Sequence, residues 1–407
     1  MKPPVWAVAL GTTMLAQSVS SFMGQCLPVV APLLTASTGL APERIGNFSS
    51  ITSVGSCLFL AFGAPFLARF GPVRMLQAGA LAAGAALLLA ATASVPALFA
   101  AALVLGLAYG PTPPAGSRIL AATAPPRHRA LIFSIKQAGA PAGGALAGLI
   151  IAPLATRHGW PTALVFAISA SLLSALAIAP LRAMMDTERD RSRAIHPRAV
   201  FSVANLMGPI GTLRADPRLI SITALAMSFS MAQGVLFSFS VTYLTQRGLG
   251  LAEAGLAYAS LQAAGVFARI FLGWLADRTG RPSHNLTAQA YVGAACLVLY
   301  AFIPVDQGLM LTASLAAVAG FFCASWNGIY MAEVARLAPP ERITDASSAS
   351  TLFTFLGYVA GPSLFAAAVP YVGWQWPYVA AGAQLATMAI IQTVILIRQS
   401  RRRMLIG

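Results

Sequence analysis

Apolar runs long enough to cross a lipid bilayer recur along the whole chain. The first one reads WAVALGTTMLAQSVSSFMGQCLPVVAPLL, and a helix needs about 20 such residues to cross the hydrocarbon core. Of the 407 residues, 57% are hydrophobic and only 9% are charged. A soluble domain carries about a quarter charged residues. The composition and the recurring runs therefore indicate an integral membrane protein.

We expect an all-α membrane protein with twelve transmembrane helices. The first run is too long for the apolar core of a signal peptide and eleven more follow it, so we expect no cleaved leader. The expected spans are 5–34, 43–67, 73–92, 97–123, 130–155, 160–182, 218–246, 251–275, 286–304, 308–337, 346–370 and 375–398.

The basic residues are distributed unevenly between the two sides of the membrane. If the N-terminus is cytoplasmic, only Arg44, Arg157 and Arg247 of the 26 basic residues fall on the opposite side, and two more lie within spans. This bias predicts that both termini are cytoplasmic. The net charge of +15 would also suit a nucleic-acid partner, but this distribution favours membrane lipids, so we expect RQSRRR (398–403) to anchor the chain at lipid headgroups.

No cofactor, metal site or catalytic motif is expected. The four cysteines, Cys26, Cys57, Cys296 and Cys323, all fall inside predicted spans without ligand-type spacing, so we interpret them as packing residues. The sequence has no Walker A motif, no HExxH and no Ser-His-Asp arrangement, and its soluble segments are too short for a catalytic domain. The chain is therefore not expected to be an enzyme.

The chain divides into two similar halves. We expect a six-helix bundle over 1–182, a cytoplasmic linker over 183–217, and a second six-helix bundle with a basic cytoplasmic tail over 218–407. One constant spacing along the chain relates four pairs of landmarks: Gly106 and Gly320, the two APP segments at 124–126 and 338–340, Gly143 and Gly357, and the Gly-Trp pairs at 159–160 and 373–374. Parallel repeats of this kind predict a substrate site at the interface between the halves, near the middle of the bilayer.

The segment GWLADRTGR (273–281) resembles the loop signature of the major facilitator superfamily of secondary transporters, and the resemblance covers essentially the whole chain. It implies alternating access between two six-helix bundles. It also assigns a gating role to five residues: Gly273, Asp277, Arg278, Gly280 and Arg281. The Asp277 carboxylate is suited to accept hydrogen bonds from a neighbouring helix N-terminus in one gate state. The alternative is a solvated turn that only sets topology.

Two positions depart from the family pattern. The first-half copy of the loop, GAPFLARFGPVR (63–74), has Ala68 where the second half has Asp277. Gly106 stands where many members carry an arginine that is tied to proton coupling. Its absence argues against a proton-driven drug antiporter.

Two cations lie inside predicted spans. Arg269 lies two helical turns before Asp277, about 12 Å along the axis, and Lys136 lies about 10 Å inward from Arg129. No acidic residue is found at their depth, so together they create a positive potential that an anion would complete. Arg269 suits a carboxylate because a guanidinium forms two parallel hydrogen bonds with it. The alternative is that both side chains bend toward the headgroups.

Further polar side chains are predicted to line the same site. Gln262 shares a helix face with Arg269, and Gln137 follows Lys136 directly. The others near mid-span are Gln17, Tyr109, Gln233, Trp326, Asn327 and Tyr358. Each would equally suit a hydrogen bond between helices. The proline run GPTPPAG (110–116) indicates either a functional unwound segment or a tolerated kink, and we favour the kink.

The leading hypothesis is a monomeric secondary transporter of a small organic anion, a carboxylate by this chemistry, in a bacterial cytoplasmic (inner) membrane. It would work by exchange or by symport with protons as the candidate coupling ion. The helix around Arg269 also resembles, more weakly, that of monocarboxylate and oxalate transporters, although helix 11 here has no basic residue. The alternative is proton-coupled efflux of hydrophobic drugs or metabolites, which normally requires a carboxylate within the membrane. A receptor or scaffold built on the same fold is a third hypothesis, and substrate flux would distinguish it.

Overall fold

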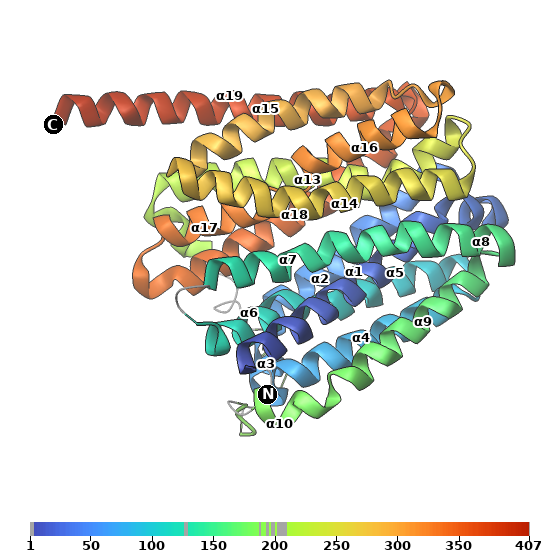
Figure 1. Cartoon of the computed structure of the whole chain (residues 1–407), viewed down its shortest axis with the longest axis horizontal. Helices are drawn as coiled ribbons and strands as arrows, with labels where there is room; N and C mark the ends of the chain where they lie inside the picture. Colours follow the sequence, from blue (N-terminus) through green and yellow to red (C-terminus); the bar gives the residue numbers. More distant parts are fainter. Residues whose placement is uncertain are drawn as a thin grey trace.

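The computed structural model describes residues 4–125, 129–186, 189–192, 195–196, 200–201 and 210–406, and these form one helical bundle (Figure 1). In the first half the helices are α1 (Val5–Thr38), α2 (Ile45–Phe62) with α3 (Ala64–Phe70), α4 (Pro72–Ala90), α5 (Val95–Tyr109) with α6 (Thr112–Thr123), α7 (Arg129–Leu146) with the π-helical turn η3 (Ala147–Ile151) and α8 (Ala152–His158), and α9 (Trp160–Ala177) followed by α10 (Arg182–Met185). In the second half they are α13 (Pro217–Gln246), α14 (Leu251–Thr279), α15 (Pro282–Ala301), α16 (Leu309–Cys323) with α17 (Asn327–Leu337), α18 (Ile343–Val372) and α19 (Gln375–Ile406).

Within the described residues, 11 helices are long and apolar enough to cross a membrane. The predicted span missing from this set is α15, whose first turns carry Ser283, His284 and Asn285 and therefore lower its mean hydropathy. It nevertheless runs along α19 (Figure 1), and Tyr291 and Thr393 share a 3.0 Å hydrogen bond between the two helices. The all-helical membrane class is confirmed, and a count of twelve crossing helices is consistent with the packing of α15.

The bundle has two distinct ends. Both termini lie at the end that also holds α3, α6, α10 and α17, which we call the termini end (Figure 1). The far end holds α8 and the tight turns at Gly159 and Gly373. These two glycines have φ values of 82° and 76°, which disfavour any residue with a Cβ atom. They belong to equivalent Gly-Trp pairs in the two halves.

The two halves pack in the same way. In the first, α1 packs on α7, α2 on α5 and α4 on α9; in the second, α13 packs on α18, α14 on α16 and α15 on α19. A Cβ atom on Gly106 would overlap the backbone of Thr52 on α2, and one on Gly320 would overlap Leu261 on α14. The absence of an arginine at Gly106 therefore has a packing reason, because no side chain fits there.

The fourth and tenth crossings are each interrupted at the same repeat position. The first break separates α5 from α6 at Gly110 and Pro111, and the second separates α16 from α17 between Cys323 and Asn327. Only the first break contains a proline. The second repeats it without one, so the proline run marks a structural feature that both halves share.

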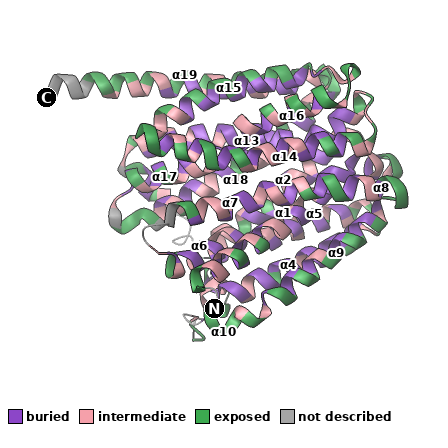
Figure 2. Ribbon diagram, viewed as in Figure 1, coloured by how far each residue is buried: buried purple, intermediate pink, exposed green. Residues whose placement is uncertain are grey.

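Burial follows the expectation for a bundle in lipid. Buried residues line the contacts between helices, and exposed ones lie along the outer faces (Figure 2). Many of the exposed side chains are large and apolar, such as Leu173, Leu176, Phe267 and Leu299. Lipid tails would cover these side chains.

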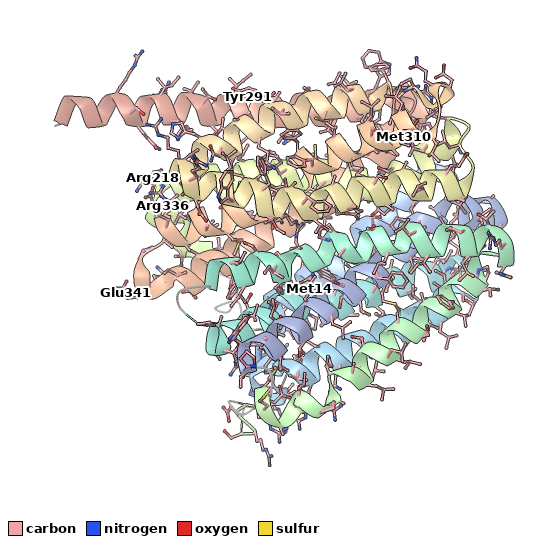
Figure 3. The ribbon with its side chains drawn as sticks, viewed as in Figure 1. Met14, Arg218, Tyr291, Met310, Arg336 and Glu341 are labelled. Carbon is pink, nitrogen blue, oxygen red and sulfur yellow. The ribbon has the colours of Figure 1, made fainter. Side chains whose placement is uncertain are left out.

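Part of the linker predicted over 183–217 lies outside the described residues, namely 187–188, 193–194, 197–199 and 202–209. At its end, Asp216 caps α13 and accepts a 2.6 Å hydrogen bond from Arg218. This bond holds the pKa of the Asp216 carboxyl below its usual value. Arg218 and Arg336 both lie toward the termini end, whereas Met310 lies toward the far end (Figure 3).

Candidate substrate site between the two halves

Arg269 lies at the junction of three helices and is only 8% exposed. Its guanidinium donates to the Ala324 carbonyl (Nε, 3.2 Å), the Gln137 carbonyl (Nη1, 2.5 Å) and Asn327 Oδ1 (Nη2, 3.3 Å). All three acceptors are neutral, and no described carboxylate forms an ion pair with Arg269. The side chain does not bend to the headgroups but holds a positive charge inside the bundle.

The helix break after α16 explains one of these contacts. Ala324 follows the last residue of α16, so its carbonyl lies at a helix end, where backbone acceptors lack partners within the helix. Gly265, one turn before Arg269, faces the Ala324 side chain, which a Cβ atom would approach to 3.4 Å. The small residue on α14 and the break in the tenth crossing thus allow the guanidinium to reach this carbonyl.

Lys136 is also buried, with 1% exposure, so it does not reach the headgroups either. Its ammonium lies against α6, where a Cβ atom on Gly116 would come within 2.7 Å of Cε and 3.2 Å of Nζ. Lys136 forms no hydrogen bond or ion pair within the described part of the chain. It does lie close enough to Arg269 for the two charges to interact.

The glycines of α7 face two different partners. Cβ atoms on Gly139 and Gly143 would meet α1, the former at 2.9 Å from the Met14 carbonyl, whereas Gly144 faces Gln262 of α14. Met14 lies near the middle of the bundle (Figure 3). Lys136 shares the α1-facing side of α7, so it and Arg269 approach the site from different directions.

A series of side-chain contacts connects most of the predicted binding residues. Next to Asn327, Trp326 donates from Nε1 to Gln233 Oε1 at 2.8 Å. The Tyr358 hydroxyl donates to the same oxygen, also at 2.8 Å.

This series of contacts continues from the second half of the protein into the first. The ring of Phe355 lies 5.8 Å from that of Tyr358 and 6.3 Å from that of Tyr109, measured between centroids. Gln17 Nε2 in turn donates to the Tyr109 hydroxyl at 2.8 Å. The structure therefore brings α1, α5, α18, α13, α17 and α14 together around one polar centre.

Gln262 belongs to a separate group nearer the far end. Its Nε2 donates to the Tyr258 hydroxyl at 2.6 Å, and that hydroxyl donates to Gln25 Oε1 at 2.7 Å. Gln262 Oε1 is buried and has no hydrogen-bond partner among the described residues. Although Gln262 shares a helix with Arg269, the structure shows no contact between these two described side chains.

The halves touch from the far end down to Arg269. Ser50 on α2 donates to the Val359 carbonyl on α18 at 2.8 Å, and Cβ atoms on Gly148 and Gly255 would clash where η3 crosses α14. Toward the termini end, α6 packs on α1, α4 and α7, within its own half. Among the hydrogen bonds between described residues of the two halves, the bond from Arg269 to Gln137 lies closest to the termini end.

The predicted gating residues lie in the last turn of α14 and the turn after it. Asp277 is exposed and forms no hydrogen bond or ion pair with any described residue. The Arg278 guanidinium lies 5.3 Å from the centre of the Trp274 ring, and Gly280 adopts φ 62° at the helix end. Gly273 and Arg281 form no hydrogen bond or ion pair with described residues of the first half, so no polar contact from this loop joins the halves here.

Asp186 makes the kind of contact that we expected of Asp277. Its only signal in the sequence is a charged residue after a predicted span. Its buried carboxylate accepts from the backbone N–H of Val73 (2.7 Å) and pairs with Arg74 (2.9 Å) at the start of α4. The first-half loop has Ala68 in place of an acid, and Asp186, at the end of the sixth crossing, supplies a carboxylate there instead.

Comparison with known proteins agrees with this architecture. An uncharacterized MFS-type transporter of Mycobacterium tuberculosis (strain CDC 1551 / Oshkosh) is 28% identical over 371 residues, covering 88% of this chain and 78% of the relative. A gallate transporter of Pseudomonas putida is 25% identical over 320 residues, covering 72% of this chain and 70% of the relative. The crystal structure of a peptide transporter in complex with sulfate shares the fold, with a TM-score of 0.74 at 16% identity over 98% of this chain and 95% of that one.

The sequence profile of the Major Facilitator Superfamily matches residues 13–362. That range begins in α1 and ends in α18, so it covers most of both halves and all of the candidate site residues between them. The chain therefore belongs to the major facilitator superfamily, and it is a multi-pass membrane transporter rather than an enzyme.

Proposed function

We propose that this transporter moves a small organic anion, a carboxylate, by alternating access, with Arg269 as the main anion ligand and Lys136 as a second positive charge. The observation that carries the proposal is the burial of both cations without a carboxylate partner among the described residues. A charge within a membrane costs at least about 2.5–3.5 kcal/mol on insertion scales, and it is normally offset by a counter-charge or by function.

The hydrogen bonds of Arg269 leave room for such a ligand. A guanidinium has five N–H donors, and three of them are engaged by neutral oxygens, so two remain for a carboxylate. Tyr109 and Tyr358 also lie close enough to interact with its charge. The relative named as a gallate transporter supports the same substrate class, because gallate is the anion of a carboxylic acid.

The similar packing within each half supports relative movement of the two halves during transport. We propose that 1–182 and 218–407 move as two bodies, connected by 183–217, and that contacts around Arg269 change as the bundle opens from one side to the other. By the positive-inside rule we place the termini end in the cytoplasm of a bacterial cell, so this conformation is closed toward the outside.

The test uses purified protein and proteoliposomes. Carboxylates should stabilise the wild-type protein against heat, because a ligand at 100 times its dissociation constant adds about 2.7 kcal/mol. Arg269→Lys should bind more weakly, since an ammonium cannot form the two-pronged bond, and Arg269→Ala should lose uptake. Arg44→Lys and Arg44→Ala provide matched controls, because Arg44 is exposed at the far end.

Wild-type anion binding in both Arg269 variants would overturn the proposal. Transport of lipophilic cations by wild-type protein, without any response to carboxylates, would favour efflux of hydrophobic compounds instead. If Arg269→Ala fails to fold, Arg269→Lys still tests the role of the guanidinium in binding, because lysine retains a donor for the Gln137 and Ala324 carbonyls.

A further inference from the structure

An unpaired donor and an unpaired acceptor lie beside α1, at Thr13 and Gln17, which are one helical turn apart. The Lys136 ammonium has no hydrogen-bond partner among the described residues and lies against Gly116, next to Thr13. Gln17 follows Thr13 by four residues, and its Oε1 atom is buried and accepts no hydrogen bond from the part of the chain that the structure describes. Both Lys136 and Gln17 are 1% exposed, so bulk water satisfies neither group.

These two groups do not bond to each other in the described structure, and the contacts around them hold each toward a different helix. Gln17 Nε2 donates to the Tyr109 hydroxyl at 2.8 Å, which holds the amide toward α5. A Cβ atom on Gly139 would lie 3.3 Å from the Gln17 Cβ, so α7 packs directly against the base of that side chain. The missing Cβ of Gly116 meanwhile leaves space for the end of Lys136 at α6.

We propose that a hydroxyl group of the substrate binds between Lys136 and Gln17, so that the transported anion is a hydroxylated carboxylate. The hydroxyl oxygen accepts from the Lys136 ammonium, and its proton is donated to Gln17 Oε1. The carboxylate of the same molecule binds Arg269. This inference rests on the proposed transport of an organic anion and specifies which anions the site selects.

Other functional groups fit this position less well. A second carboxylate only accepts hydrogen bonds, so it would leave Gln17 Oε1 unpaired. An ammonium only donates, and it would face the charge of Lys136. A hydroxyl group both donates and accepts, so of these groups it alone can pair with both Lys136 and Gln17 Oε1.

The test compares ligands that differ only in this hydroxyl. Dissociation constants of the wild-type protein are measured by thermal stabilisation for 4-hydroxybenzoate, benzoate and 4-fluorobenzoate, and for 4-hydroxybutanoate and butanoate. We expect at least one hydroxylated acid to bind about tenfold more tightly than its counterpart without the hydroxyl, because otherwise both buried groups stay unpaired. In Gln17→Met the ratio of the two constants should fall toward 1.

Gln384→Met is the matched control. Gln384 also has a buried Oε1 without a partner, but its Nε2 donates to Ser228 within the second half, so the ratio should remain as in wild type. Equal binding of each pair by the wild-type protein would overturn the inference, since the position then holds water only, while the anion proposal would stand. No binding of any carboxylate would overturn the proposed function itself.

Discussion

The Nη1 atom of Arg269 on α14 donates a 2.5 Å hydrogen bond to the backbone carbonyl of Gln137 on α7. One side chain therefore carries a buried positive charge of the candidate site and also joins the two halves. An anion that binds Arg269 competes with, or reorients, a bond across the interface. In the proposed mechanism this competition connects substrate binding to the relative position of the halves.

The tight crossing of η3 and α14 should control closure at the far end. A Cβ atom on Gly148 would lie 2.5 Å from the Gly255 carbonyl, and backbone cannot move aside easily. Gly148→Ala should therefore separate the halves there and raise the rate at which a cysteine placed at Ser50 reacts with a water-soluble maleimide. Gly24→Ala on α1 is the control, because nothing lies within 4 Å of its added Cβ. Equal reaction rates in both variants would mean that this crossing does not hold the far end closed.

The position of the Lys136 ammonium should depend on Gly116. In Gly116→Ala the new Cβ would lie 2.7 Å from Cε, so the flexible end of Lys136 has to move while the backbone remains in place. We expect the dissociation constant for the anion to rise about three- to tenfold, consistent with a weakened charged hydrogen bond, with little change in melting temperature. Gly11→Ala, whose added Cβ meets nothing within 4 Å, serves for comparison. An unchanged dissociation constant would remove Lys136 from the binding site.

Asp277 should affect turnover rather than affinity. Its carboxylate is exposed and unpaired in the described structure, so a gating role requires a partner in another conformation. Asp277→Asn should slow uptake while the dissociation constant stays within a few fold, and Asp306→Asn, an exposed acid in a far-end loop, should change neither. Uptake at the wild-type rate in Asp277→Asn would leave this loop with a topological role.

The orientation in the membrane can be tested with single cysteines. Labels at Met1, Asp190 and Gly407 should react only with reagents that reach the cytoplasm, and labels at Gly159 and Gln375 should react from outside. The physical reason is the concentration of arginine at the termini end, which the positive-inside rule places in the cytoplasm. A C-terminus labelled from outside would contradict both this orientation and an even number of crossing helices.

The amino-acid sequence by itself determined the membrane class and the repeat. A bilayer demands about 20 apolar residues for each crossing helix, so these helices can be recognised without tertiary information. The equivalent glycines, such as Gly106 and Gly320, were also visible, because close backbone contact excludes every larger residue. Burial of Arg269 could be predicted in the same way from its place inside an apolar run.

Only the tertiary structure decided what each polar group contacts. Arg269 bonds to the carbonyls of Ala324 and Gln137, and a backbone carbonyl is present at every residue, so it leaves no mark in a sequence. Asp186 caps α4 from the distant sixth crossing, and Lys136 turns toward Gly116 rather than toward α14. The hydropathy of a segment depends only on its own residues, so it is the same for every arrangement of the helices. Hydrogen-bond partners instead depend on how helices far apart in the chain are brought together.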